Sequence, residues 1–295
     1  FVGESSWEKA ERKLLEEAAL LAVQKAGMSI DQVDLFIGGD LLNQIISATF
    51  ASRTFGIPYL GVFGACSTSM ESLALAALTV STKFADYALA GTSSHNSTAE
   101  RQFRYPTEDG SQKPPTAQNT ATGAGAALVA RQGEGPRITC ATIGKIVDMG
   151  ITDPFNMGAA MAPAAADTIK THLADRGVSP GYYDLIVTGD LGAVGSTMVR
   201  ELFAHSGVPI EETTYDDCGL LLYDREKQQV FAGGSGCACS ATVTYAHLLK
   251  RMEQGELKRI LVVATGSLQS PLTVQQKESI PGIAHAVAIE YGGGQ

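Results

Sequence analysis

The sequence predicts an α/β fold made of two similar halves, and two observations support this. Short apolar and β-branched runs alternate with segments of helical periodicity along all 295 residues, which is typical of α/β proteins. The chain also contains a weak internal repeat, because VDLFIGGDLLNQ at 33–44 is similar to YDLIVTGDLGAV at 183–194. We therefore expect two halves, 1–150 and 151–295, with the same order of elements.

The elements follow from these patterns in chain order. The amphipathic, charged stretch at the start of the chain predicts a helix. After it the first half should contain a strand at 33–37, a helix over 41–50, a turn and helix within 62–78, a strand at 87–90, a long polar loop and a strand at 126–130. The second half should contain a strand within 183–190, a helix near 196–205, a turn at 233–240 followed by a helix, and a strand at 259–267.

Charge and composition exclude several classes of protein. The net charge of −9 and a pI near 5.1, without a block of lysine or arginine, argue against a nucleic-acid partner. No apolar run reaches the ~18 residues of a membrane span, so we expect membrane contact only through a partner. The five cysteines lack the spacing of a disulfide framework, which favours a reduced, intracellular protein. Cys237 and Cys239 have no second ligand pair, so neither a metal nor a cofactor is predicted.

Cys66 follows an apolar run and Gly64 at a predicted strand-to-helix turn, where proteins often place a nucleophile or an anion site. The unpaired N–H groups of a helix start favour thiolate, so we expect a lowered pKa for this thiol. The alternative is that Cys66 is a small buried residue where a helix packs on a sheet.

Two motifs in this order, GACSTSME at 64–71 and IPGIAHAVAIE at 280–290, resemble the thiolase and β-ketoacyl synthase family. That resemblance implies five layers, α-β-α-β-α, with the starts of two central helices meeting near Cys66 and Ser240. It also implies a nucleophilic cysteine, which needs a histidine and an oxyanion hole. Here Gly189 and Asp190 stand where the family has histidine, and GGSGCACS at 233–240 contains neither imidazole nor amide. An ordinary condensing enzyme is therefore disfavoured.

The segments SSHNSTAERQFRYPTE at 93–108 and DPFNMGAAMAPAAADTI at 153–169 resemble the stage V sporulation protein AD family. The resemblance implies a protein that binds dipicolinic acid, as the free acid or its calcium salt, and supports its uptake into the developing spore without turnover. It also implies membrane partners among the other stage V sporulation A proteins, a peripheral position on the spore inner membrane of sporulating bacteria, and a homodimer.

Pyridine-2,6-dicarboxylate is flat and doubly negative, so its site needs N–H donors or cations beside an apolar slot. The two helix starts offer the first, and arginines beside Phe103 offer both, although such a loop is equally suited to a dimer contact or surface ion pairs. The candidate ligand-binding residues are Cys66, Ser67, Thr68, His95, Arg101, Arg104, Met157, Ser235, Cys239, Ser240 and His285.

Several alternatives stay open at this point. An acyltransferase or condensing enzyme would use Cys66 as nucleophile with His95 or His285 as base, and a structural subunit would keep the pocket as a relic. His172 should face solvent. Asp40 and Asp190, at equivalent strand ends, are expected to cap helices or maintain the fold's symmetry.

Overall fold

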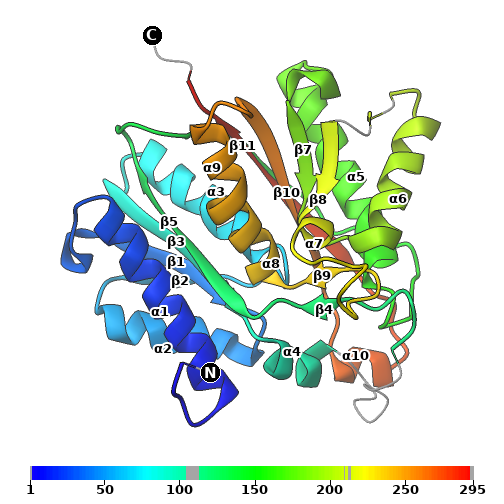
Figure 1. Ribbon diagram of the computed structural model, residues 1–295, viewed down its shortest axis with the longest axis horizontal. Helices are drawn as coiled ribbons and strands as arrows, with labels where there is room; N and C mark the ends of the chain where they lie inside the picture. Colours follow the sequence, from blue (N-terminus) through cyan, green and yellow to red (C-terminus); the bar gives the residue numbers. More distant parts are fainter. Residues whose placement is uncertain (1, 104–112, 209, 212–213, 293–295) are drawn as a thin grey trace.

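The computed structural model describes residues 2–103, 113–208, 210–211 and 214–292. Two mixed β-sheets alternate with three layers of helices, so the predicted α-β-α-β-α order is confirmed (Figure 1). The layers are, in order, α1 and α2, the first sheet, α3 with the α8–α9 segment, the second sheet, and α5 with α6.

The first sheet has the strand order β2-β1-β3-β5, in which only β5 is antiparallel to its neighbour. Its strands are β1 (Leu35–Asp40), β2 (Tyr59–Gly61), β3 (Tyr87–Ser94) and β5 (Gly123–Ala130). Its helices are α1 (Trp7–Lys25), α2 (Ile46–Phe55), α3 (Thr68–Ser81) and α4 (Asn96–Phe103).

The second sheet has the order β6-β11-β10-β7-β8. Its strands are β6 (Arg137–Ile143), β7 (Leu185–Thr188), β8 (Tyr215–Asp217), β10 (Arg259–Ser267) and β11 (Gly282–Glu290), and β4 (Asn119–Thr120) separately pairs with β9 (Gly234–Ser235). Its helices are α5 (Met157–Arg176), α6 (Gly192–His205), α7 (Cys218–Leu221), α8 (Cys237–Thr242), a π-helical turn (Val243–Leu248), α9 (Leu249–Glu253) and α10 (Pro271–Gln275).

The internal repeat has a physical basis in two equivalent aspartates. Asp34 accepts the backbone N–H groups of Asp86 and Tyr87, both at 2.9 Å, just where β3 begins. Asp184 accepts those of Lys258 and Arg259, at 2.7 and 2.8 Å, where β10 begins. Each carboxylate therefore fixes the start of the neighbouring parallel strand in its own half, and the predicted duplication is confirmed.

The helix after β1 starts later than the sequence indicates, at Ile46 rather than 41. Gln44 and Ile45 have positive φ, +55° and +47°, a conformation that is costly for a β-branched residue. The buried carboxylate of Asp40 holds this segment, since it accepts N–H groups from Leu42 at 2.8 Å and Ala48 at 2.7 Å. The expected capping role of Asp40 is thus confirmed.

The two sheets differ at one edge. β6 pairs with β11 although it precedes residue 150, so the expected division between 1–150 and 151–295 does not coincide with the division between sheets. Within the described residues β5 has no such neighbour, and a groove of about 720 Å³ runs along it, lined by α3, α9 and the β5–β6 turn. The halves therefore match strand for strand except at this edge.

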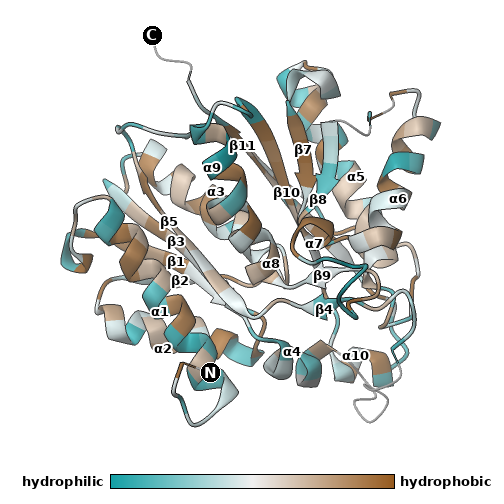
Figure 2. Cartoon of the chain, in the orientation of Figure 1, coloured by the Kyte–Doolittle hydropathy of each residue, from teal (hydrophilic) through white to brown (hydrophobic). Residues whose placement is uncertain are grey.

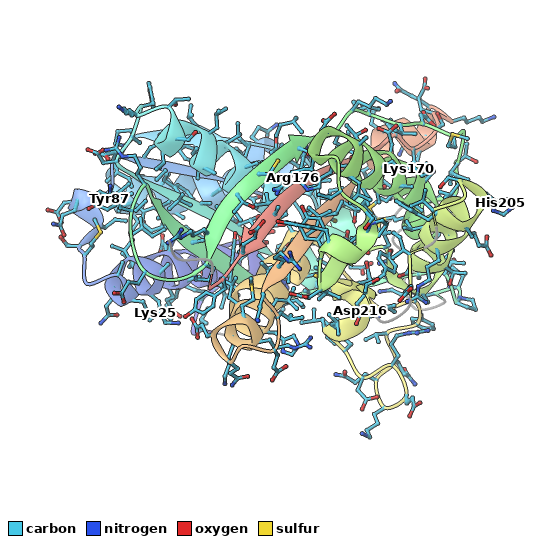
Figure 3. All side chains as sticks on the ribbon, turned by 90° about the horizontal axis from the view of Figure 1, so that it is seen from above. Lys25, Tyr87, Lys170, Arg176, His205 and Asp216 are labelled. Carbon is cyan, nitrogen blue, oxygen red and sulfur yellow. The ribbon has the colours of Figure 1, made fainter. Side chains whose placement is uncertain are left out.

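The cores lie between the layers. Figure 2 shows the apolar colouring concentrated on β7, β10 and β11 and on the inward side of the helices. Seen from above, Lys25 and Tyr87 mark the first half, and Lys170, Arg176, His205 and Asp216 mark the second (Figure 3). Among the described residues, none of the helices combines the length and hydropathy required to cross a membrane.

Candidate functional site

Cys66 lies in a tight turn that leads into α3. Ala65 has φ +50°, which turns the chain sharply between Gly64 and the helix. The hydroxyl of Ser67 donates to the carbonyl of Gly64 at 2.7 Å, and that of Thr68 donates to the carbonyl of Ala65 at 2.8 Å. These two hydroxyl protons therefore stabilise the turn. The backbone N–H groups of Ser67 and Thr68 are held in it as well, because they donate to the carbonyls of Gly64 at 3.0 Å and Ala65 at 3.3 Å.

The starts of α3 and α8 meet, as the resemblance implied. The hydroxyl oxygens of Ser69 and Ser240 lie 2.6 Å apart, both fully buried, which joins the first turns of the two helices. Gly236, the residue before α8, has φ +99°, and a Cβ there would approach the hydroxyl of Ser94 at 2.8 Å. Glycine is therefore required for α8 to begin this close to the first half.

Asp190 is the polar group behind Cys66. One oxygen of its carboxyl accepts the Gly236 N–H at 2.8 Å and the other accepts the Thr265 hydroxyl at 2.8 Å. The Cys66 thiol lies next to this carboxyl group. Asp190 is fully buried, and burial raises the pKa of this carboxyl to about 7. The expected capping role is thus met at the start of α8, and contact with Cys66 is added to it.

The expectation of a lowered Cys66 pKa is wrong. Burial raises the pKa of the thiol well above its usual value, and the neighbouring Asp190 and Cys237 raise it further. The Gly236 N–H favours thiolate, but one such donor does not offset the loss of water and a nearby carboxyl. Cys66 is therefore held as a neutral thiol at neutral pH.

Apolar side chains surround this thiol. The cluster consists of Leu41, Ala65, Ala99, Phe103 and Cys237, with Leu268 partly buried against it. Phe103 comes from the last position of α4 and is 8% exposed. The site thus combines a helix start with an apolar wall that carries one aromatic ring.

The histidines lie in other hydrogen-bonding arrangements. His95 accepts the Ser97 N–H on Nδ1 at 3.1 Å and packs on Trp7 of α1, with ring centroids 5.0 Å apart. His285 accepts the Gly144 N–H on Nδ1 at 3.3 Å. Within the described residues no imidazole is hydrogen-bonded to Cys66.

His172 was expected to face solvent, and this is wrong. It is fully buried, between the Thr142 hydroxyl at 2.8 Å and the Tyr183 hydroxyl at 2.6 Å. His205 lies at the outer edge of the second half in Figure 3, next to the carbonyl of Glu201.

The other predicted residues are distributed more widely. Met157 begins α5 and packs with Leu191 in the core between α5 and the second sheet. Ser235 lies in β9. Cys239 is buried in the core between the two sheets, close to Gly234. Arg104 lies outside the described residues, and of Arg101 only the backbone, in α4, is described.

Ser69 and Cys237 are not among the candidate ligand-binding residues chosen from the sequence. The Cys237 thiol donates to the carbonyl of Ser93 at 2.9 Å and shares the apolar cluster with Cys66. The sequence signal was present, since Ser69 lies in the predicted turn and helix within 62–78 and Cys237 lies in the predicted turn at 233–240. Among the described residues no three His, Cys, Asp or Glu side chains are grouped so as to hold a metal ion.

The raised pKa of Cys66 leads to a chemical prediction. Iodoacetamide at about pH 8 should modify Cys140, which is partly exposed, well before Cys66, which is 5% exposed. In Asp190→Asn the rate at Cys66 should rise about tenfold, because the carboxyl that opposes thiolate is gone. Mass spectrometry of both peptides gives the two rates, with Cys140 as internal control. Equal rates at Cys66 and Cys140 in the unmodified protein would contradict this.

The duplicated five-layer architecture, with a cysteine where two central helices start, defines a thiolase-like protein. Solved structures agree on the fold. 3-Oxoacyl-[acyl-carrier-protein] synthase III of Aquifex aeolicus VF5 is 17% identical, with a TM-score of 0.60 over 94% of this chain and 83% of that one. Human mitochondrial 3-ketoacyl-CoA thiolase is 15% identical, with a TM-score of 0.63 over 95% of this chain and 93% of that one.

The chain belongs to the stage V sporulation protein AD family, whose sequence profile matches residues 1–290. Stage V sporulation protein AD of Bacillus subtilis (strain 168) is 56% identical over 291 residues, which cover 99% of this chain and 86% of that protein. Family membership gives the chain a role in sporulation.

Proposed function

We propose that this chain binds dipicolinic acid at the Cys66 site and supports its uptake into the developing spore, without catalytic turnover. The observation that carries the proposal is the meeting of α3 and α8 beside Cys66, with Ser69 and Ser240 2.6 Å apart. The positive ends of two helix dipoles suit a carboxylate, and Phe103 offers an aromatic face for a flat ring.

The state of the cysteine supports binding over acyl transfer. A nucleophilic cysteine needs a base that removes its proton, and a lowered pKa assists that step. Here burial and Asp190 raise the pKa of Cys66, while His95 and His285 bond to backbone N–H groups. The thiol therefore contributes a small, neutral surface to the site and does not act as a nucleophile.

Calorimetry with dipicolinate tests the proposal. A saturable heat is expected, and Phe103→Ala should weaken binding about threefold to tenfold, because the ring contact is lost. Phe84→Ala is the matched control, since Phe84 is 76% exposed and should leave affinity unchanged. In parallel, the protein is incubated with acyl-CoA and the Cys66 peptide is analysed by mass spectrometry. Stable acylation of Cys66 with turnover, and no dipicolinate heat, would establish the acyltransferase instead.

We also propose that the protein is a homodimer, held peripherally at the spore inner membrane by other stage V sporulation A membrane proteins. β2 is an edge strand of the first sheet, and Leu60 and Phe63 on and beside it are 50% and 49% exposed. An exposed apolar strand edge of this kind suits pairing with a second copy. Light scattering on Leu60→Lys and on the unmodified protein distinguishes dimer from monomer.

A further inference from the structure

The polar groups around Asp190 carry no positive charge to balance an anion. The titratable groups facing it are Cys66 from the start of α3, Cys237 and Cys239 from α8, Cys218 from α7, and Asp217 at the end of β8. β10 contributes the Thr265 hydroxyl, and the Gln118 side chain contacts the Asp190 carbonyl oxygen. Among the described residues no lysine, arginine or histidine belongs to this set.

A ligand carboxylate placed against Cys66 therefore lies one side chain away from a second, buried carboxyl group. Two negative charges in a site closed to water repel strongly, and the usual solution is that the two groups share one proton. The Gly236 N–H and the Thr265 hydroxyl both donate to Asp190, and these two hydrogen bonds favour its ionised form when no ligand is present. Ligand arrival changes that balance.

We propose that Asp190 takes up one proton when an anionic ligand occupies the Cys66 site, so that anion binding there is coupled to proton uptake. This inference rests on the proposed function, because it concerns the same site and ligand. Asp190 thereby sets the pH range in which an anion binds well beside Cys66. Acidification of the compartment that contains the protein would strengthen binding, and alkalinisation would promote release.

The other buried carboxyls are less suited to this role. Asp217 accepts N–H groups from Leu191, Gly192 and Gly219 at 2.8 to 3.0 Å as well as the Thr188 hydroxyl, a full set of donors that favours the anion. Asp40 is held by the backbone before and within α2. Asp190, in contrast, lies beside the Cys66 thiol.

The free protein has Asp190 poised for this exchange, because burial brings its pKa to about 7. Above that value Asp190 is largely ionised, and binding must then add a proton. Linkage predicts that the dipicolinate affinity falls about tenfold for each pH unit in that range. Below it the proton is already present, and the affinity should become independent of pH.

The experiment is calorimetry of dipicolinate binding at about pH 6 and about pH 8, in HEPES and in Tris, two buffers with different ionisation enthalpies. The difference between the buffers gives the number of protons taken up, which should approach one at the higher pH and fall toward zero at the lower. This readout needs no variant. In Asp190→Asn both the buffer difference and the pH dependence should disappear, while Asp175→Asn, an exposed carboxyl on α5, should behave like the unmodified protein.

The outcomes separate the two proposals. Binding without a buffer difference at the higher pH overturns proton coupling and leaves the proposed function standing. A buffer difference that persists in Asp190→Asn overturns the assignment to Asp190. No dipicolinate heat at either pH overturns both proposals. A uniform drop in affinity in Asp190→Asn with an unchanged proton count would mean that Asp190 only supports the shape of the site.

Discussion

Gly39→Ala is expected to lower the free energy of unfolding by about 3 kcal/mol or more. Gly39 lies near the end of β1, and a Cβ there would overlap the carbonyl oxygen of Val62 and come within 3.0 Å of the Thr68 methyl. Val62 is held in turn by its N–H bond to the Gly38 carbonyl, 3.1 Å away. Backbone must move to admit even one methyl group, and the segment that moves is the one that carries Cys66.

Urea unfolding followed by circular dichroism measures this effect. Gly133→Ala is the matched control, because its Cβ would meet nothing within 4 Å and its φ is not in the left-handed region. The control should change stability by no more than about 0.5 kcal/mol. We also expect Cys66 to react faster with iodoacetamide in Gly39→Ala, since the turn loosens. Equal unfolding midpoints for the two variants would show that β1 and the Cys66 segment adapt to each other more freely than their contact indicates.

Glu11→Gln is expected to flatten the dependence of stability on pH. Glu11 is fully buried on α1, where it accepts hydroxyl groups from Ser93 at 3.2 Å and Thr98 at 2.8 Å. Burial, with a further contribution from Asp40, raises the pKa of this carboxyl from 4.5 to about 8. The folded state therefore binds a proton that the unfolded state releases above about pH 4.5.

The sign follows from linkage. Because the folded pKa is the higher one, the proton stabilises the folded state fully below about pH 4.5, and that stability is lost as the pH rises toward about 8. Between these values the slope is up to about 1.4 kcal/mol per pH unit for this group. Glutamine cannot ionise, so the variant should lose this slope and exceed the unmodified protein in stability near pH 8.

Chemical denaturation at about pH 5, 6.5 and 8 measures the slope. Glu17→Gln, exposed on the same helix, is the control and should keep the slope of the unmodified protein. Asp40, Asp190 and Asp217 also have raised pKa values, to about 6, 7 and 6, and continue to contribute in both variants. An unchanged slope in Glu11→Gln would mean that Glu11 remains ionised in the folded protein.

The periodicity and internal repeat of the sequence predicted an α/β fold of two similar halves, and the resemblance to the thiolase family added its five layers. Asp34 and Asp184 stand at the same position of the repeat, each before an apolar strand, and the structure gives both the same contacts. The start of α2 could not be predicted, since it depends on Asp40 reaching Ala48 eight residues away. A tertiary hydrogen bond of this kind leaves no local signal.

The geometry of the candidate site was predicted in outline, whereas its electrostatics was not. The turn at Cys66 and the partner helix start at Ser240 follow from motif order, and they do meet. The pKa of Cys66 follows from burial and from Asp190, a residue 124 positions away that local helix rules do not include. His172 was misplaced for a related reason, because its partners Thr142 and Tyr183 come from other elements.

The two sheets differ in whether the strand at one edge is covered by a further strand. The main-chain groups on the free side of β5 have no strand opposite them among the described residues, whereas β11 is enclosed by β6 and β10. Such an edge is a liability, because it can pair with any extended polypeptide that reaches it. A covering strand antiparallel to β5, the counterpart of β6, would remove that liability and restore the twofold pattern.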